Sequence, residues 1–241
     1  EFLKMKIAIL GYGKMGKEIE KISLERGHDI IFKIDKDSKV ENIKGADVAI
    51  NFSTPDSAVK NIELGLKSLV PVISGTTGWL TNFNRIKKLS EKLKVSFLYS
   101  SNFSLGVNLF FELNKKLAEI MKKNDQYKLN IEETHHIKKI DKPSGTAISL
   151  AEGIIEIGKY NDWSINSNKN KSISIESKRI DKVHGIHKVK YSSMIDSIEI
   201  IHTAKNRKGF ALGAIISAEW IIDKKGIFDM KDVINDPKFK F

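Results

Sequence analysis

Three glycines near the start of the chain restrict its fold more than any other feature. Gly11, Gly13 and Gly16 form a GxGxxG motif between the apolar run KIAIL and the segment KEIEKISLER, whose apolar residues recur at helical spacing. Glycines in that position permit a tight turn and a close approach of the backbone to a ligand, and the amides that begin the next helix attract a pyrophosphate. The motif therefore predicts the first unit of a Rossmann-like dinucleotide-binding domain.

An acidic residue at the end of the next apolar run strengthens this prediction. Asp35 follows DIIFKI, in the position where a carboxylate accepts hydrogen bonds from the adenosine ribose. Lys36 beside it suits a 2′-phosphate, which the carboxylate repels, so both NADH and NADPH stay open as cofactors. The alternative is a glycine turn that serves packing alone, with Asp35 as a strand-end cap.

Apolar runs alternate with helical patterns in the rest of the first half. DVAINFS, PVISG and VSFLYSS follow the two runs above, and the alternation predicts a parallel sheet with helices on both faces. Such a sheet binds ligands at the carboxyl ends of its strands. Residues after the fourth and fifth strands are therefore either cofactor contacts or ordinary turns: Gly75, Thr76, Thr77, Ser100, Ser101, Asn102 and Phe103.

The pattern changes after a long predicted helix at residues 104–123. YKLNIEETHH, SISIESKRI, HGIHKVKYSS and SIEIIHTA are typical of strands, and one clear helix, SGTAISLAEGIIEIGK, lies among them. This order predicts an α+β domain whose sheet is mixed and mainly antiparallel, with one face on a helix and the other free for a partner subunit. We expect a dinucleotide-binding domain of residues 1–103 and 211–241, and a substrate-binding and oligomerisation domain of residues 104–210.

The segment EETHHIKKIDKPSGTA, residues 132–147, is the one best suited to chemistry. It leaves a strand, crosses a polar loop and enters a helix at Ser144, a favourable N-cap, with Gly145 and Thr146 in the first turn. Backbone amides joined by lysine and histidine donors suit a carboxylate, and the two histidines offer proton transfer near neutral pH. The alternative interpretation is that the two histidines only cap the end of the strand and that the lysines form a solvated surface. A metal site would need a third ligand, which no spacing supplies, so we expect none.

Composition limits the partners and the compartment. The formal net charge is +11, but the lysines are scattered along the chain without a basic stripe, which argues against a nucleic-acid partner and favours a small anionic substrate. The chain has no cysteine, which fits a reducing compartment. Because no apolar run is long enough to cross a bilayer and no signal-peptide pattern is found, we expect a cytoplasmic protein without a membrane partner.

The string HHIKKIDKPSGTA resembles the signature of the dihydrodipicolinate reductase family, whose members are also called 4-hydroxy-tetrahydrodipicolinate reductases. GYGKMG, ISGTTGW, SSNFSLGVN, RIDKVHGIH and HTAKNRKGFALGAIISAEW extend the resemblance over both expected domains. It implies an oxidoreductase that uses NADH or NADPH to reduce 4-hydroxy-tetrahydrodipicolinate, a cyclic dicarboxylate, to tetrahydrodipicolinate with loss of water, in the diaminopimelate route to lysine. It also implies a homotetramer built through the sheet of the second domain.

The resemblance also implies residue roles. His135 matches the family's general acid/base, and Lys139 matches the residue proposed to donate a proton. The substrate carboxylates are expected at His136, Lys139, Ser144, Gly145 and Thr146. The cofactor is expected at Gly11, Tyr12, Gly13, Lys14, Met15, Asp35, Lys36, Gly75, Thr76, Thr77, Ser100, Ser101, Asn102 and Phe103.

The chain departs from the family pattern at several places: the first glycine turn is one residue shorter than is common in the family, and residues 161–171 match poorly. Asn51 stands where an acidic residue is expected, and Asp181 replaces a glycine expected after Arg179. Two other functions stay open at this point: a reductase for a different imine or oxo-acid on the same scaffold, and a nucleotide-sensing protein that binds a dinucleotide without turnover.

Overall fold

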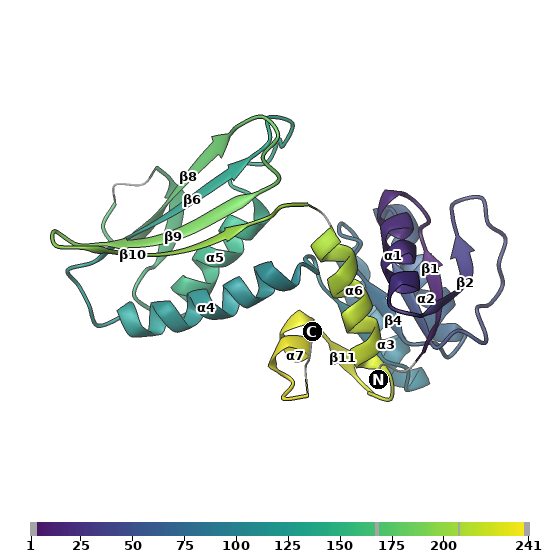
Figure 1. Ribbon diagram of the computed structural model, residues 1–241. Coiled ribbons are helices and arrows are strands. Elements are labelled where there is room, and N and C mark those ends of the chain that lie inside the picture. Colours follow the sequence, from purple (N-terminus) through teal and green to yellow (C-terminus); the bar gives the residue numbers. More distant parts are fainter. Residues whose placement is uncertain (1–3, 167–168, 207, 239–241) are drawn as a thin grey trace. The chain divides into compact units, whose positions relative to one another are not determined.

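The computed structural model describes residues 4–166, 169–206 and 208–238, and the chain divides into two compact units (Figure 1). Unit 1 comprises Glu1–Leu105 with Lys208–Phe241, and unit 2 comprises Gly106–Arg207. The domain boundaries expected from the sequence, after residues 103 and 210, lie near these divisions. The first unit is therefore formed by both ends of the chain.

Unit 1 is built on a six-stranded sheet in the order β11-β5-β4-β3-β1-β2, and all neighbouring strands pair in parallel. The strands are β1 (Lys6–Leu10), β2 (Asp29–Ile34), β3 (Val48–Asn51), β4 (Val72–Ser74), β5 (Phe97–Tyr99) and β11 (Ile227–Phe228). The helices are α1 (Lys14–Glu25), α2 (Pro55–Lys67), α3 (Phe83–Leu93), α6 (Lys208–Ile221) and α7 (Met230–Asn235), with a short 3-10 helix, η1 (Leu80–Asn82).

Helices cover both faces of this sheet, which confirms the predicted Rossmann-like domain. Ile7 and Ile9 of β1 pack in one core with α1, α6 and α7, whereas Ala8 and Leu10 pack in a second core with α2 and α3. Successive side chains of a strand point to opposite faces, so one apolar strand serves both cores. This explains why KIAIL is a continuous apolar run after its first residue.

A charged cluster ties α6 to the beginning of the chain. Glu219 of α6 accepts two hydrogen bonds of 2.8 Å from Arg26 and lies 2.8 Å from Nε2 of His28. The His28 side chain is 1% exposed and that of Glu219 is 11% exposed. These contacts join segments that are far apart in the sequence.

We expect Glu219→Ala to lower the free energy of unfolding by about 3 kcal/mol, because it removes the carboxylate that offsets a partly buried guanidinium and bonds to a buried imidazole. Urea unfolding measures this change. Glu119→Ala, which removes an exposed ion pair with Lys116, is the control and should leave the unfolding midpoint unchanged. Equal losses in the two variants would contradict the assigned role of Glu219.

Unit 2 is built on a five-stranded sheet in the order β10-β9-β6-β8-β7. Its strands are β6 (Lys128–His135), β7 (Asp162–Ile165), β8 (Ser172–Arg179), β9 (Ile186–Ser192) and β10 (Ser197–Thr203). Helices α4 (Leu105–Met121) and α5 (Gly145–Ile155) supply the other half of a core that includes Phe110, Leu150 and the inward side chains of the strands. None of the helices in the described part of the chain combines the length and the hydropathy that crossing a membrane demands.

This sheet is mixed, which confirms the expected α+β domain. Strand β9 pairs antiparallel with β10 and β6, whereas β8 pairs parallel with β6 and β7. Helix α5 follows β6 as a crossover, so β7 and β8, the next two strands, run in the direction of β6. The prediction missed β7, β11 and α7, because each is too short to show a clear period.

Candidate active site

The glycine-rich turn of unit 1 joins the end of β1 to the start of α1. Gly11 has a φ of +99°, and a Cβ at this position would lie 2.4 Å from the carbonyl oxygen of Phe52. Gly13 is the N-cap of α1, and a Cβ there would meet nothing within 4 Å. The turn thus requires glycine at its first position and leaves open space at the helix start, where an anion binds most readily.

A cavity of about 640 Å³ adjoins this turn at the carboxyl ends of β1, β2 and β3. Asp35 and Lys36 line it together with the two glycines of the turn, and the Asp35 carboxylate accepts a hydrogen bond of 2.8 Å from the Lys36 backbone. The prediction overlooked most of its lining, although Phe52 and Ser53 end a predicted strand. The additional lining residues are Ile34, Ser38, Lys39, Val40, Glu41, Phe52, Ser53, Thr54, Ser57, Lys60, Asn61 and Leu64.

A smaller cavity of about 230 Å³ lies at the ends of β3 and β4. A Cβ on Gly75 would lie 2.3 Å from the Phe52 ring, and the Thr76 hydroxyl accepts a hydrogen bond of 2.8 Å from the Ser53 backbone. The predicted residues Met15, Gly75, Thr76 and Thr77 therefore come together here, with Phe52, Ser53 and Pro55.

The remaining cofactor candidates line neither of these two cavities. Ser100 accepts a hydrogen bond of 3.1 Å from the Asn102 backbone in the turn that contains Ser101. Phe103 is 1% exposed and packs edge-on against Phe52 in the core. Tyr12 donates a hydrogen bond to Glu20, while Lys14 begins α1.

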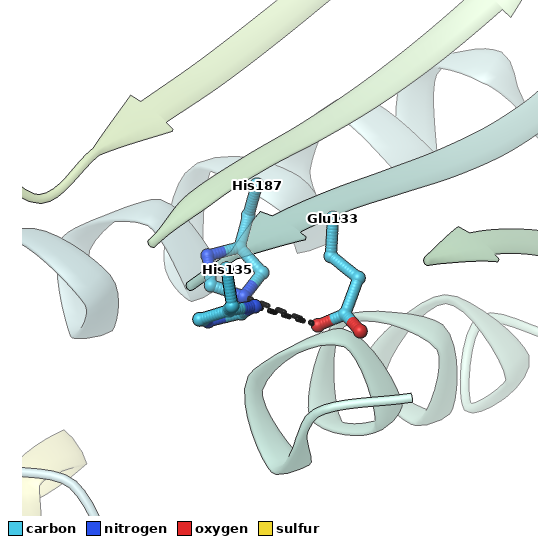
Figure 2. A group of neighbouring side chains, drawn as sticks. All are labelled: Glu133, His135 and His187. Atoms are coloured by element: carbon cyan, nitrogen blue, oxygen red, sulfur yellow. Dashed lines mark ion pairs between the residues drawn. The ribbon is translucent and has the colours of Figure 1, made fainter. Parts of the chain in front are cut away.

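Three ionisable side chains meet at the end of β6 in unit 2. Figure 2 shows the rings of His135 and His187 and the carboxylate of Glu133 directed toward one another. Glu133 and His135 stand two residues apart on one face of β6, and His187 is the register partner of Glu133 on β9. The three residues are only 0%, 7% and 4% exposed. A pattern of alternate residues on neighbouring strands therefore builds a buried polar cluster.

The Glu133 carboxylate is the centre of this cluster. Its Oε2 lies 3.2 Å from Nδ1 of His135, an ion-pair distance without hydrogen-bond direction, and accepts a hydrogen bond of 3.1 Å from the Ser144 backbone. Its Oε1 accepts a hydrogen bond of 3.1 Å from Arg179 of β8. Nε2 of His187 lies 3.2 Å from the Ser144 hydroxyl. Groups from three strands and one helix start thus hold a single carboxylate.

Burial and charge assign different protonation states to these groups. Burial alone raises the pKa of Glu133, but the donors of His135 and Ser144 outweigh it and hold that pKa well below its usual range. Burial, with a smaller contribution from the charge of His135, lowers the pKa of His187 to about 3. At neutral pH Glu133 is therefore ionised and His187 is neutral.

The same three residues offer donor atoms within 4.8 Å of one another, a spacing that suits a metal ion as well as a proton. The Glu133 carboxylate, however, already bonds to the Arg179 guanidinium and to the Ser144 amide. A guanidinium beside the carboxylate offsets its charge and disfavours a second cation at that position. We therefore interpret the cluster as a group that holds and transfers a proton.

The loop after β6 carries the other predicted residues. Lys139 lies 2.9 Å from Asp141 and its amine is partly exposed, while its backbone N–H donates to the His136 carbonyl. Ser144 is the N-cap of α5, and its hydroxyl accepts a hydrogen bond of 3.3 Å from Ala147. Gly145 and Thr146 form the first helical turn, so their amides begin the helix. A helix start beside a lysine and two histidines can bind a carboxylate and donate a proton.

Sequence reasoning did not identify Glu133, Arg179 and His187 as site residues. A signal existed for Glu133, which precedes His135 by the two-residue period of a strand. Arg179 and His187 lie within RIDKVHGIH, which supported the resemblance without a role being given to either. Their contact with the loop depends on strand pairing, since Arg179 also donates a hydrogen bond of 3.2 Å to the Lys139 carbonyl.

Comparison with known proteins covers nearly the whole chain. The sequence models described as "Dihydrodipicolinate reductase, N-terminus" and "Dihydrodipicolinate reductase, C-terminus" match residues 5–103 and 106–234. The 4-hydroxy-tetrahydrodipicolinate reductase of Christiangramia forsetii is 51% identical over 96% of this chain and 98% of its own length. The 4-hydroxy-tetrahydrodipicolinate reductase of Thermosipho africanus is 37% identical over 96% of this chain and 99% of its own length. A dipicolinate-bound dihydrodipicolinate reductase from Paenisporosarcina sp. TG-14 has the same fold, with a TM-score of 0.78 at 20% identity over 96% of this chain and 100% of its own.

Proposed function

The chain belongs to the dihydrodipicolinate reductase family, and we propose that it catalyses the reaction after which its relatives are named. In that reaction 4-hydroxy-tetrahydrodipicolinate, NAD(P)H and a proton give tetrahydrodipicolinate, NAD(P)⁺ and water. The product belongs to the diaminopimelate route to lysine. The observation that carries the proposal is the 51% identity to a 4-hydroxy-tetrahydrodipicolinate reductase over 96% of this chain. The segment 132–147 supports it, because His135 ends β6 and the N-cap Ser144 begins α5 within that segment.

The substrate is a dianion that must be held still while it accepts a hydride and a proton. The amides of Gly145 and Thr146 at the start of α5 bind one carboxylate, with His136 and Lys139 as charged or polar partners. Ser144 keeps this helix start in place through its cap. His135 and Lys139 then supply the proton that neutralises the charge developing on the ring.

The residues of unit 1 fit a nicotinamide dinucleotide. The absent side chain of Gly13 leaves room for a pyrophosphate at the N-terminus of α1, and the adjoining cavity accommodates the adenosine next to Asp35. Met15 in the first turn of α1 and Gly75–Thr77 after β4 line the smaller cavity, toward which the rest of the cofactor would extend. When bound, the reduced nicotinamide supplies the hydride.

We also propose that both NADH and NADPH serve. The Asp35 carboxylate suits the ribose hydroxyls of NADH, yet one of its oxygens already accepts a bond from its own turn. Three lysines line the same cavity and can pair with the 2′-phosphate of NADPH: Lys36, Lys39 and Lys60. The mixture of two acids, Asp35 and Glu41, with three lysines favours neither cofactor over the other.

We also propose that the protein is cytoplasmic and that it assembles as a homotetramer through the sheet of unit 2. The sheet face opposite α4 and α5 carries half-exposed side chains such as Glu132 and Lys188, which form an ion pair of 2.9 Å. The edge strand β10 exposes Ile198 and Ile201. An uncovered sheet edge with apolar side chains is well suited to pairing with another subunit.

The loss of reduced-nicotinamide absorbance tests the activity. With freshly prepared 4-hydroxy-tetrahydrodipicolinate, we expect rapid oxidation of NADH and of NADPH, with kcat/KM values within about tenfold of each other, because the adenosine cavity combines Asp35 with lysines. Reactions without substrate are the control. Dinucleotide binding without oxidation would support a sensing role instead, and turnover only with another imine or oxo-acid would identify a different reductase.

A further inference from the structure

We propose that Glu133 is a positioning residue of this reductase: its fixed carboxylate orients the His135 ring through Nδ1, so that Nε2 is the nitrogen that gives a proton to the substrate. The inference rests on the proposed function, because it concerns the proton transfer of that reaction. It gives a role to a residue that does not touch the substrate and acts through another side chain.

The first support is the position of the carboxylate. Glu133 and His135 project from the same face of β6, which brings Oε2 to 3.2 Å from Nδ1. This contact occupies the Nδ1 side of the ring and leaves Nε2 for the substrate. A Cβ on Gly185 would lie 3.1 Å from Nε2, so the glycine at this position keeps the space beside that nitrogen open.

The second support is that the carboxylate is immobilised. Glu133 is 0% exposed, and an unpaired charge at such a position would cost several kcal/mol. Arg179 holds Oε1 and the Ser144 backbone holds Oε2, each at 3.1 Å. Two donors from separate elements therefore fix the carboxylate, and through it the His135 ring, relative to the start of α5. A group fixed in this way needs no reorganisation when the proton moves.

The third support is the charge of the neighbouring groups. The charged or titratable groups around His135 come from five segments: Glu133 on its own strand, Arg179 on β8, His187 on β9, His202 on β10, and Lys139 with Asp141 in the loop. Burial lowers the pKa values of both His187 and His202, which leaves these rings neutral at neutral pH. Lys139 is paired with Asp141 and Arg179 with Glu133. Glu133 is thus the carboxylate that contacts His135.

The chemical consequence follows from this arrangement. A carboxylate beside Nδ1 keeps a proton on that nitrogen, so Nε2 is the nitrogen that transfers a proton to the reacting ring. Removal of an orienting carboxylate from a catalytic histidine leaves binding largely intact but lowers the rate of the proton-transfer step, by tenfold to several thousandfold in comparable sites.

The test is the isosteric substitution Glu133→Gln in the full-length protein. We expect kcat to fall by about 100-fold while KM for substrate and cofactor changes by less than about threefold. The pH profile of kcat should also change, because the carboxylate that contacts the proton donor is lost. Glu152→Gln, the same change on an exposed position of α5, is the matched control and should leave kcat and the pH profile unchanged.

Glu133→Asp keeps the charge but shortens the reach, and serves as the second variant if Glu133→Gln does not fold. We expect Glu133→Asp to lower kcat but to change the pH profile of kcat less than Glu133→Gln does. Dinucleotide binding to unit 1 and thermal unfolding check the fold of each variant. Wild-type kcat and pH profile in either folded variant would overturn the inference, whereas a wild-type protein without turnover would refute the proposed function instead.

Discussion

Reductase activity is expected to fall by about a hundredfold or more when His135 is replaced by alanine, and by a comparable factor in Lys139→Ala. Both residues lie where β6 leads to the start of α5, and both can give a proton to the ring that accepts the hydride. Alanine removes the donor without filling its space, so the proton must then come from water. Initial rates with saturating substrate and cofactor measure the change in kcat.

The two variants should differ in their effect on substrate binding. Lys139 carries a positive charge that also attracts a substrate carboxylate, so Lys139→Ala should raise KM for the substrate together with its effect on kcat. His135 is 7% exposed, and its proposed role is in the proton transfer, so its replacement should change kcat more than KM. Lys138→Ala, at an exposed position of the same loop, is the control. If the variants of His135 and Lys139 retained the wild-type kcat, neither residue could be the proton donor of the proposed reaction.

Gly11→Ala is expected to abolish measurable dinucleotide binding and to destabilise the protein by about 2–4 kcal/mol. A Cβ at this position would lie 2.4 Å from the Phe52 carbonyl oxygen and 2.8 Å from the Ser53 Cα, both of which are backbone atoms. The φ of +99° adds strain for any residue with a side chain. The end of β3 must therefore move, and it lines both cavities of unit 1.

Gly13→Ala separates binding from stability. A Cβ there would meet nothing within 4 Å, so the unfolding midpoint should stay within experimental error of the wild type. The new methyl group would nevertheless occupy the space at the start of α1, and we expect dinucleotide affinity to fall by about tenfold or more. Calorimetric titration with NADPH and thermal unfolding measure the two effects. Equal behaviour of the Gly11 and Gly13 variants would contradict this division of roles.

Local signals in the sequence were sufficient for much of the fold. The alternation of apolar runs and helical patterns predicted the parallel sheet of unit 1, because two faces covered by helices require continuous apolar strands. Pairing direction in unit 2 was not predictable in the same way. The residue pattern of a strand is the same whether its neighbour runs parallel or antiparallel. That β8 pairs in parallel with β6 is seen only in the assembled sheet.

The sequence by itself determined the contiguous parts of the candidate site, which stay predictions as functional residues: the glycine turn at the start of α1 and the segment from His135 to Thr146. The tertiary structure alone decided what surrounds His135. Strand register brings His187 opposite Glu133 and Arg179 opposite His135, although these residues are far apart in sequence. A buried carboxylate needs donors from several directions, and a folded sheet can supply them where a single stretch of chain cannot.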